Sequence, residues 1–337
     1  MISPRTLRNL RTELRRSALA KLGIVVVLLV LFVAVSAPLI APHNPTKQHL
    51  EQSQLPPLGF SSVSTHTSSK MVNGTIKIVN QTTRVNASAA YPLGTDNLGR
   101  GMLSRVIYGT RTSLLVGIFG TGIAALIGVT VGLTAGYYRG HVDDVLMRAA
   151  DVMLAFPSLV LAIALIGLWG RAVVRIPDPL VATGVTPGMP PDFVLPGTVI
   201  VVVALVNWVW FARMARGEAL SVREEEYVKA ARSLGASDGY IIRKHVLPNS
   251  ITPILVLATI QIAAIILLES SLSFLGFSGT TLSWGFDISQ GRNFLASSWW
   301  LSTIPGLAIF VTVVGINLIG DWLRDALDPG IQGEGGV

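Results

Sequence analysis

Six apolar runs alternate with polar segments along the chain, and each run is long enough to cross a lipid bilayer. A helix rises ~1.5 Å per residue, so about twenty apolar residues span a hydrocarbon core of ~30 Å. This pattern predicts an all-α membrane protein with six transmembrane helices. The runs cover residues 22–41, 112–137, 145–169, 194–211, 251–277 and 303–323.

A long polar segment, residues 43–91, follows the first apolar run. It is rich in Ser, Thr, Asn and Gln, and it predicts an extracytoplasmic insertion after the first helix. Alternation over residues 75–79 favours a short strand within it. Three Asn-x-Ser/Thr sequons make Asn73, Asn80 and Asn86 candidate glycosylation sites. Such sequons also arise by chance in Ser/Thr-rich loops, and the pattern does not indicate what the insertion does.

Basic residues gather beside particular apolar runs. Residues 1–21 carry six cations and one acid, and residues 213–250 carry seven cations. Cytoplasmic segments of membrane proteins are enriched in Lys and Arg. We therefore expect a multi-pass protein of the cell membrane with both termini in the cytoplasm. Prolines, rather than a small-residue cleavage site, follow the first run, which favours a retained anchor over a signal peptide.

These assignments divide the chain into four parts. They are the cytoplasmic N-terminus with the first transmembrane helix (1–42), the extracytoplasmic insertion (43–111), a five-helix core (112–324) that includes a cytoplasmic loop (213–250), and a cytoplasmic tail (325–337).

Composition narrows the classes of function. The chain is 50% hydrophobic and only 13% charged, with net charge +7 and mean hydropathy +0.58; soluble domains carry about 25% charged residues. The cations lie in loops beside apolar runs, so the expected partner is a lipid bilayer and no nucleic acid. The sequence has no Cys, no His pair at ligand spacing and no Gly-Lys dipeptide, so we expect no catalytic residue, metal or cofactor in this chain. If ATP drives the protein, another chain binds ATP and Mg.

Three residues stand out within the apolar runs. Pro157 lies near the middle of the third run and predicts a kinked helix. Asp151, near the inner end of that run, is expected to pair with Arg148 one turn back. Glu269, followed by Ser270, lies in the fifth run, where a charge in lipid costs about 2.5–3.5 kcal/mol. Either Glu269 faces a transport path or a partner subunit, or it is a structural carboxylate bonded to nearby hydroxyls.

Small residues recur every four positions in the second run, at Gly128, Gly132 and Gly136. Such a stripe lets another helix approach closely. We interpret it as a packing surface and not as a binding site.

The charged loop at residues 213–250 predicts a helix, a corner and a second helix. The first helix covers about residues 224–234, which contain neither Gly nor Pro. Gly235 then permits the left-handed backbone of a sharp corner. The second helix is expected to begin at Ser237 or Asp238 and to end near Val246, just before Pro248.

This loop resembles the cytoplasmic loop of ATP-binding-cassette (ABC) importer permeases, whose motif is roughly E-A-A, three residues, Gly, nine residues, a hydrophobe, any residue, Leu-Pro. Lys229 stands where the motif has Glu, and His245 where it has Ile. The resemblance implies a type I ABC importer transmembrane-domain fold and a coupling helix that seats in a separate ATPase. The residues assigned to this ATPase-coupling loop are Glu226, Tyr227, Ala230, Ala231, Leu234, Gly235, Ala236, Leu247 and Pro248.

Residues 91–111 narrow the resemblance to the C-type permease subunit of dipeptide and oligopeptide importers. The shared stretch reads PLGTDNLGR at residues 92–100, and Asp96 or Asn97 is expected to cap the helix that follows. The implied function is uptake of peptides that an extracytoplasmic binding protein delivers. The implied partners are that binding protein, a second related permease subunit in a heterodimer, and two ATPase subunits. Pro157, Glu269 and Ser270 are candidates for the translocation path or the permease interface.

Other functions stay open from the sequence alone. An importer of nickel or another small solute would show the same subunit pattern. A stand-alone secondary transporter or channel would be expected to carry charges deep in several spans or broken helices in paired positions. A membrane scaffold without transport fits the composition but leaves the charged loop without a role.

Overall fold

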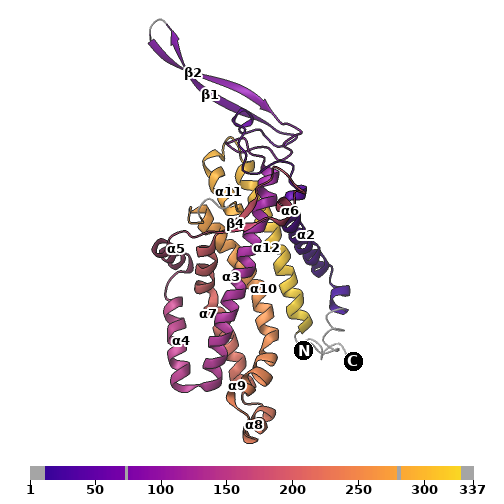
Figure 1. Ribbon diagram of the computed structural model, residues 1–337, viewed down its shortest axis with the longest axis vertical. Coiled ribbons are helices and arrows are strands. Elements are labelled where there is room, and N and C mark those ends of the chain that lie inside the picture. Colours follow the sequence, from indigo (N-terminus) through magenta and orange to yellow (C-terminus); the bar gives the residue numbers. More distant parts are fainter. Residues whose placement is uncertain (1–11, 73–74, 279–281, 328–337) are drawn as a thin grey trace.

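A computed structural model describes residues 12–72, 75–278 and 282–327 of the chain. The long helices lie side by side along the longest axis of an elongated molecule (Figure 1). Within the described ranges, five helical segments are long and apolar enough to cross a membrane. They are α2 (Ala18–Ile40), α3 (Met102–Tyr138), α7 (Gly197–Val222), the continuous helix Asp238–Phe274 and α12 (Trp300–Leu327).

The third predicted span is a pair of helices, α4 (Gly140–Leu154) and α5 (Ser158–Trp169), bent by 92° at the break between them. A kink at Pro157 was predicted here, and its place is confirmed, but the bend divides the span into two helices. Pro157 caps the start of α5 with an extended ψ of 127°, and it has no backbone N–H to continue the ladder of α4. The bend is therefore a full break, and six spans are reached when the pair is counted as one.

Two antiparallel hairpins interrupt the helices. In the polar insertion, β1 (Ser61–Val72) pairs with β2 (Thr75–Asn86) along their whole length. The short strand predicted at residues 75–79 is confirmed and continues to Asn86. Asn80 lies in β2, Asn86 is exposed at its end, and Asn73 lies outside the described residues. The second hairpin pairs β3 (Val174–Pro177) with β4 (Asp192–Leu195).

The two ends of the molecule differ (Figure 1). The β1–β2 hairpin projects from one end, which we call the hairpin end. The helices α8 (Glu226–Ser233) and α9 (Asp238–Ile241) form the tip of the other, the α8–α9 end. Shorter elements gather toward the hairpin end: η1 (Leu50–Gln52), α6 (Pro179–Ala182), α11 (Trp284–Gly291) and η3 (Arg292–Phe294).

Spanning helices are longer than their apolar runs predicted, as α3 and α7 illustrate. α3 begins at Met102, ten residues before the expected start, and α7 continues to Val222. The apolar runs end at charged residues. The helices continue past them because these residues form ion pairs and hydrogen bonds with neighbouring elements. On α7, Arg216 makes two hydrogen bonds to Asp143 of α4, at 2.6 and 2.7 Å.

Asp151 likewise pairs across helices. Its carboxylate accepts a 2.7 Å hydrogen bond from Arg213 of α7, so the predicted pairing with Arg148 is wrong. The reason is that α7 extends past its apolar run and places Arg213 beside α4. The sequence of α4 alone does not reveal this partner. Both side chains are about half exposed, and such a pair contributes under about 1 kcal/mol.

The stripe of small residues on α3 packs against α7, as predicted. A Cβ added at Gly132 would meet the Ala212 carbonyl oxygen and would lie 2.9 Å from the Ala215 Cβ. Added atoms at Gly128 and Gly136 would also meet atoms of α7 at distances no native packing contains. The two helices therefore approach as closely as their backbones allow.

We predict that Gly132→Leu destabilises the folded protein by about 1–3 kcal/mol, because the new side chain forces α3 and α7 apart. Thermal unfolding of the purified protein in detergent measures the effect. Gly122→Leu on the same helix is the matched control, since a Cβ there has nothing within 4 Å. Equal effects of the two substitutions would contradict the packing role of the stripe.

A buried ion cluster closes the hairpin end. Arg105 of α3 is 1% exposed and donates to Asp287 of α11, with its Nε 2.9 Å from Oδ1. It also donates to the Pro45 carbonyl at 3.2 Å and lies 3.8 Å from Asp96. The cluster thus joins three segments that are far apart in the sequence.

Asp96 or Asn97 was predicted to cap α3. Neither residue caps it, and Asp96 closes its own turn instead. Its carboxylate accepts from the backbone N–H groups of Leu98 and Arg100, at 2.9 and 2.8 Å, and from the Arg100 side chain. Gly101, the residue before α3, makes no side-chain cap. The carboxylate closes its own turn because these donors lie nearer than the start of the helix.

A second buried arginine, Arg111 of α3, compensates for a proline in α2. Pro38 has no N–H, so it leaves the carbonyl of Ala34, four residues earlier, without its helical partner. Arg111 Nε donates to that oxygen at 2.5 Å. The same guanidinium pairs with Asp178 at the start of α6. The proline and the arginine are thus linked by one hydrogen bond across two helices.

Candidate functional site

The α8–α9 end begins with a tight turn after α7. The N–H groups of Glu224 and Glu225 donate to the carbonyls of Ser221 and Val222, each at 3.1 Å. The first loop helix, α8 (Glu226–Ser233), therefore starts two residues later than predicted. It lies at the tip of the molecule (Figure 1).

A glycine corner ends α8, as predicted. Gly235 has φ +81°, and its N–H donates to the Arg232 carbonyl at 3.0 Å. The N–H of Ala236 donates to the Ala231 carbonyl at 3.1 Å. These two bonds form a Schellman motif, in which the residue after the helix adopts the left-handed conformation. A side chain at Gly235 would have open space around it, so the requirement for glycine is one of backbone conformation.

Val228 anchors α8 to the rest of the protein. It is fully buried, whereas every other residue of α8 is exposed or half-buried. It belongs to a core cluster that includes Tyr137, Val222, Ile241 and Val246. Val228 was not among the residues predicted for the coupling loop. A signal was available, because residues 224–234 of the predicted helix contain only two large aliphatic side chains, Val228 and Leu234.

The second helix of the loop, which we call its second arm, continues into the membrane span as one unbroken helix. α9 (Asp238–Ile241) leads through a π-helical turn, η2 (Ile242–Val246), into α10 (Leu247–Phe274). The prediction that Pro248 ends this helix is wrong. Pro248 occupies the first turn of α10, and the wider π turn before it avoids the clash between the proline ring and the carbonyl four residues earlier.

The predicted coupling residues divide into an inner and an outer set. Ala231, Ala236 and Leu247 pack against the core cluster that holds Val228. The outer set is exposed: Leu234 is 88% exposed and Tyr227 is 44% exposed. Glu226, Ala230 and Pro248 are exposed as well.

Tyr227 and His245 connect the two arms. Their ring centroids lie 5.8 Å apart, and the Asn249 side chain donates to the Tyr227 hydroxyl at 3.2 Å. Burial raises the pKa of the Tyr227 phenol, and the nearby Glu225 carboxylate raises it further. His245, at a motif position where Ile is usual, thus forms part of this contact.

Lys229, at the motif position of Glu, is compensated locally. Its Nζ lies 3.2 Å from Glu226 and 4.0 Å from Glu224. Both are surface pairs and contribute little to stability. On the second arm of the loop, a groove of about 470 Å³ is lined by Ser237, Gly239, Tyr240, Arg243 and Lys244.

Glu269 lies inside this chain and not on an open surface. The carboxylate is fully buried and accepts from Ser273 at 2.5 Å and from Ser113 of α3 at 3.2 Å. Ser270 lies at 3.4 Å from it. Of the two alternatives given for Glu269, its geometry matches a structural carboxylate that is hydrogen-bonded to hydroxyls. Pro157 is exposed at the α4–α5 break and belongs to a different element.

The opposite side of α10 carries an exposed stripe. Val256, Ile260, Ala264, Leu267 and Ser271 follow helical spacing and are exposed or half-buried. A groove lies at each end of this stripe. One, of about 380 Å³, is bounded by α5, α10 and α11 and includes Ser270 in its wall.

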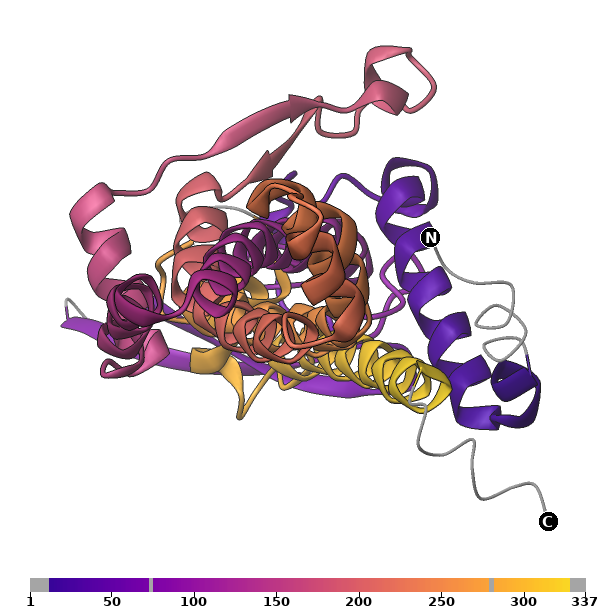
Figure 2. The same ribbon diagram turned by 90° about the horizontal axis from the view of Figure 1, so that it is seen from below.

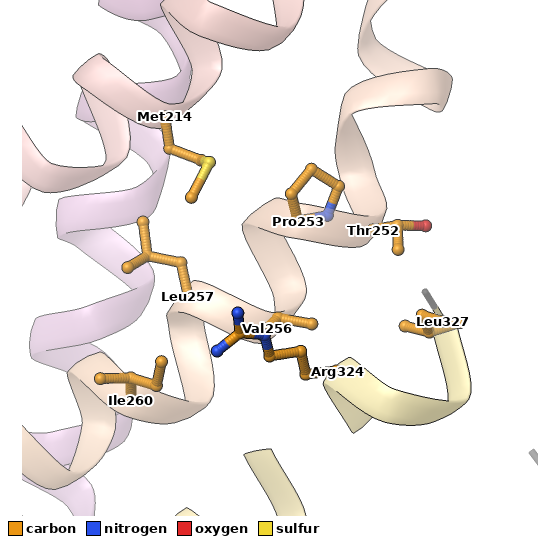
Figure 3. A pocket seen from close by; sticks show the side chains of 8 residues that line it. All are labelled: Met214, Thr252, Pro253, Val256, Leu257, Ile260, Arg324 and Leu327. Atoms are coloured by element: carbon orange, nitrogen blue, oxygen red, sulfur yellow. The ribbon is translucent and has the colours of Figure 1, made fainter. Parts of the chain in front are cut away.

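The other groove, of about 490 Å³, opens between α7, α10 and α12 (Figure 3). Its walls are mostly apolar and include Met214 of α7 and Leu257 of α10. Figure 3 shows Arg324 reaching from α12 toward α10 across this groove. The stripe and its two grooves form a continuous, mostly apolar face.

Comparison with known proteins identifies the class. The family described as binding-protein-dependent transport system inner membrane component matches residues 128–333. The N-terminal TM domain of oligopeptide transport permease C matches residues 7–57. The chain belongs to this family of transport permeases, and the predicted resemblance is confirmed.

Individual relatives are peptide permeases. The chain is 40% identical to the dipeptide transport system permease protein DppC of Alkalihalophilus pseudofirmus, over 72% of this chain and 73% of that protein. It is 33% identical to the probable D,D-dipeptide permease DdpC of Escherichia coli, covering 95% and 91% of the two chains. It is 38% identical to the glutathione permease GsiD of Pectobacterium atrosepticum, covering 73% and 74%.

The fold matches a solved ABC importer. A chain of the MetNI methionine ABC transporter, in an inward-facing conformation, superimposes with a TM-score of 0.52 at 17% identity. The match covers 67% of this chain and 98% of that one. The predicted type I ABC importer fold is confirmed, and the class implies ATPase and binding-protein partners in general.

Proposed function

We propose that this chain is the C-type permease subunit of an ATP-driven importer of short peptides. The observation that carries the proposal is a helix–corner–helix loop, anchored by Val228, at the tip of a permease fold whose relatives are peptide permeases. Its exposed Leu234 and Tyr227 are the surface that would seat in an ATPase. Family members named for dipeptides, D,D-dipeptides and glutathione favour a short peptide as the solute.

The α8–α9 end is the cytoplasmic end in this proposal. Arg213, Arg243 and Lys244 are among the cations that gather there. The start of α2 and the end of α12 point toward the same end (Figure 1), so both termini would be cytoplasmic. The hairpin end would then face the binding protein outside the cell.

The partners follow from this orientation. Two ATPase subunits bind ATP and Mg and engage the α8–α9 end of this chain and of a second, related permease. The exposed stripe of α10, with its groove at each end, is the surface we assign to the path and to that second permease. Glu269 lies on the other side of α10 and supports the helix from within. Transport requires only that the ATPase hold α8 differently in its two states.

The test is reconstitution of the complex in vesicles with its ATPase, its second permease and its binding protein. We expect ATP-dependent uptake of a labelled dipeptide, and none when the ATPase is omitted. Nickel supplied in place of the peptide is the matched comparison. Uptake of nickel alone would contradict the peptide assignment, and uptake by this chain alone would contradict the permease-subunit assignment.

A further inference from the structure

The end of α3 lies against the loop at the α8–α9 end. Tyr137, the penultimate residue of α3, is only 2% exposed. Its hydroxyl donates a 2.6 Å hydrogen bond to Asp238 Oδ1, the first residue of α9. Seen from below, the loop helices cover this end of the bundle (Figure 2).

Two arginines approach the ring of the same tyrosine. The guanidinium carbon of Arg232, on α8, lies 5.4 Å from the ring centroid, and that of Arg223, after α7, lies at 5.7 Å. Both distances are within the range of cation–π attraction. Arg223 also donates to the Tyr137 backbone carbonyl.

One residue of α3 thus contacts each of the three parts of the loop: the turn after α7, α8 and α9. A neighbouring contact strengthens the junction, since Arg139 pairs with Glu224 at 2.8 Å. By contrast, Val228 is the only fully buried side chain of α8 within the described chain. The second arm of the loop gives α8 a route to α10, and the polar, directional contacts of Tyr137 give it a route to α3.

We infer that Tyr137 is the positioning residue through which displacement of α8 reaches α3. This inference rests on the proposed coupling function. α3 runs 37 residues from this contact to the hairpin end, where Arg105 joins it to α11. A shift at the ATPase surface can therefore reach the outer side of the permease along one continuous helix.

The test uses the complete reconstituted complex and measures peptide transported per ATP hydrolysed. Tyr137→Leu removes the ring and the hydroxyl, and we expect this ratio to fall about fivefold while ATP hydrolysis continues. Tyr137→Phe keeps the ring and loses only the hydrogen bond, so we expect a fall of about twofold. Asp238→Asn retains an acceptor and should keep a ratio near that of the unmodified complex.

Two further variants separate positioning from a general structural role. Asp238→Ala should resemble Tyr137→Phe, and the double variant should be no worse than either single one, because both remove the same bond. An unchanged ratio in Tyr137→Leu would overturn the inference. So would a fall in transport and hydrolysis in equal proportion, since the ratio would then be constant. If Gly235→Pro uncouples transport but Tyr137→Leu does not, the coupling function stands and only the role of Tyr137 fails.

Discussion

Gly235→Pro is expected to lower ATP-driven uptake by about tenfold or more while the protein still inserts and folds. Proline fixes φ near −65°, whereas Gly235 needs +81°. The substitution also removes the N–H that donates to Arg232. α8 would then leave its place beside α9, and closure of the ATPase would no longer move the membrane helices. Uptake and ATP hydrolysis by the reconstituted complex are the measurements.

Gly184→Pro is the matched control for this prediction. Gly184 also has a left-handed φ, +75°, open space around it and an N–H that donates to a nearby carbonyl. It lies after α6, away from the coupling loop, so the same backbone change there should leave transport per ATP unchanged. Normal uptake by Gly235→Pro would show that the corner has no part in coupling.

Asp287→Ala is expected to destabilise the folded protein by about 3–5 kcal/mol, because it leaves a buried cation without its partner. Arg105 is 1% exposed and takes its closest charge compensation from Asp287. Asp96, at 3.8 Å, already pairs with Arg100. The loss is measured as a lower midpoint in thermal unfolding of the purified protein in detergent.

Asp151→Ala removes the carboxylate from an exposed pair with Arg213 and serves as the control. We expect it to cost under about 1 kcal/mol. Arg105→Met combined with Asp287→Ala should recover part of the lost stability, since no uncompensated charge then remains. If Asp287→Ala and Asp151→Ala had the same effect, the buried cluster would contribute no more than a surface pair.

Local patterns in the sequence were sufficient for much of this protein. Apolar runs of bilayer length located the spanning helices, because a helix in lipid must satisfy its own backbone and present apolar side chains. Gly235 identified the corner, because few other residues adopt a left-handed backbone without strain. The stripe around Gly132 identified a packing face from spacing alone. The charged loop and its Ala-Ala-x3-Gly pattern led to the correct family.

The same patterns could not predict how each proline would change its helix. The break at Pro157 became a 92° bend, whereas the proline at Pro248 interrupts nothing because a π turn precedes it. Both positions hold the same residue type, so the conformation of the surrounding backbone decides whether the proline breaks the helix.

The sequence by itself determined where the apolar runs lie, the glycine corner and the family, because each depends on residues near one another in the chain. Only the tertiary structure decided which partners three buried side chains have. Glu269 accepts from hydroxyls, Arg111 donates to the carbonyl that Pro38 leaves without a helical partner, and Tyr137 contacts the loop. A buried polar group must find its partner wherever packing places one, and that place is set by the whole fold.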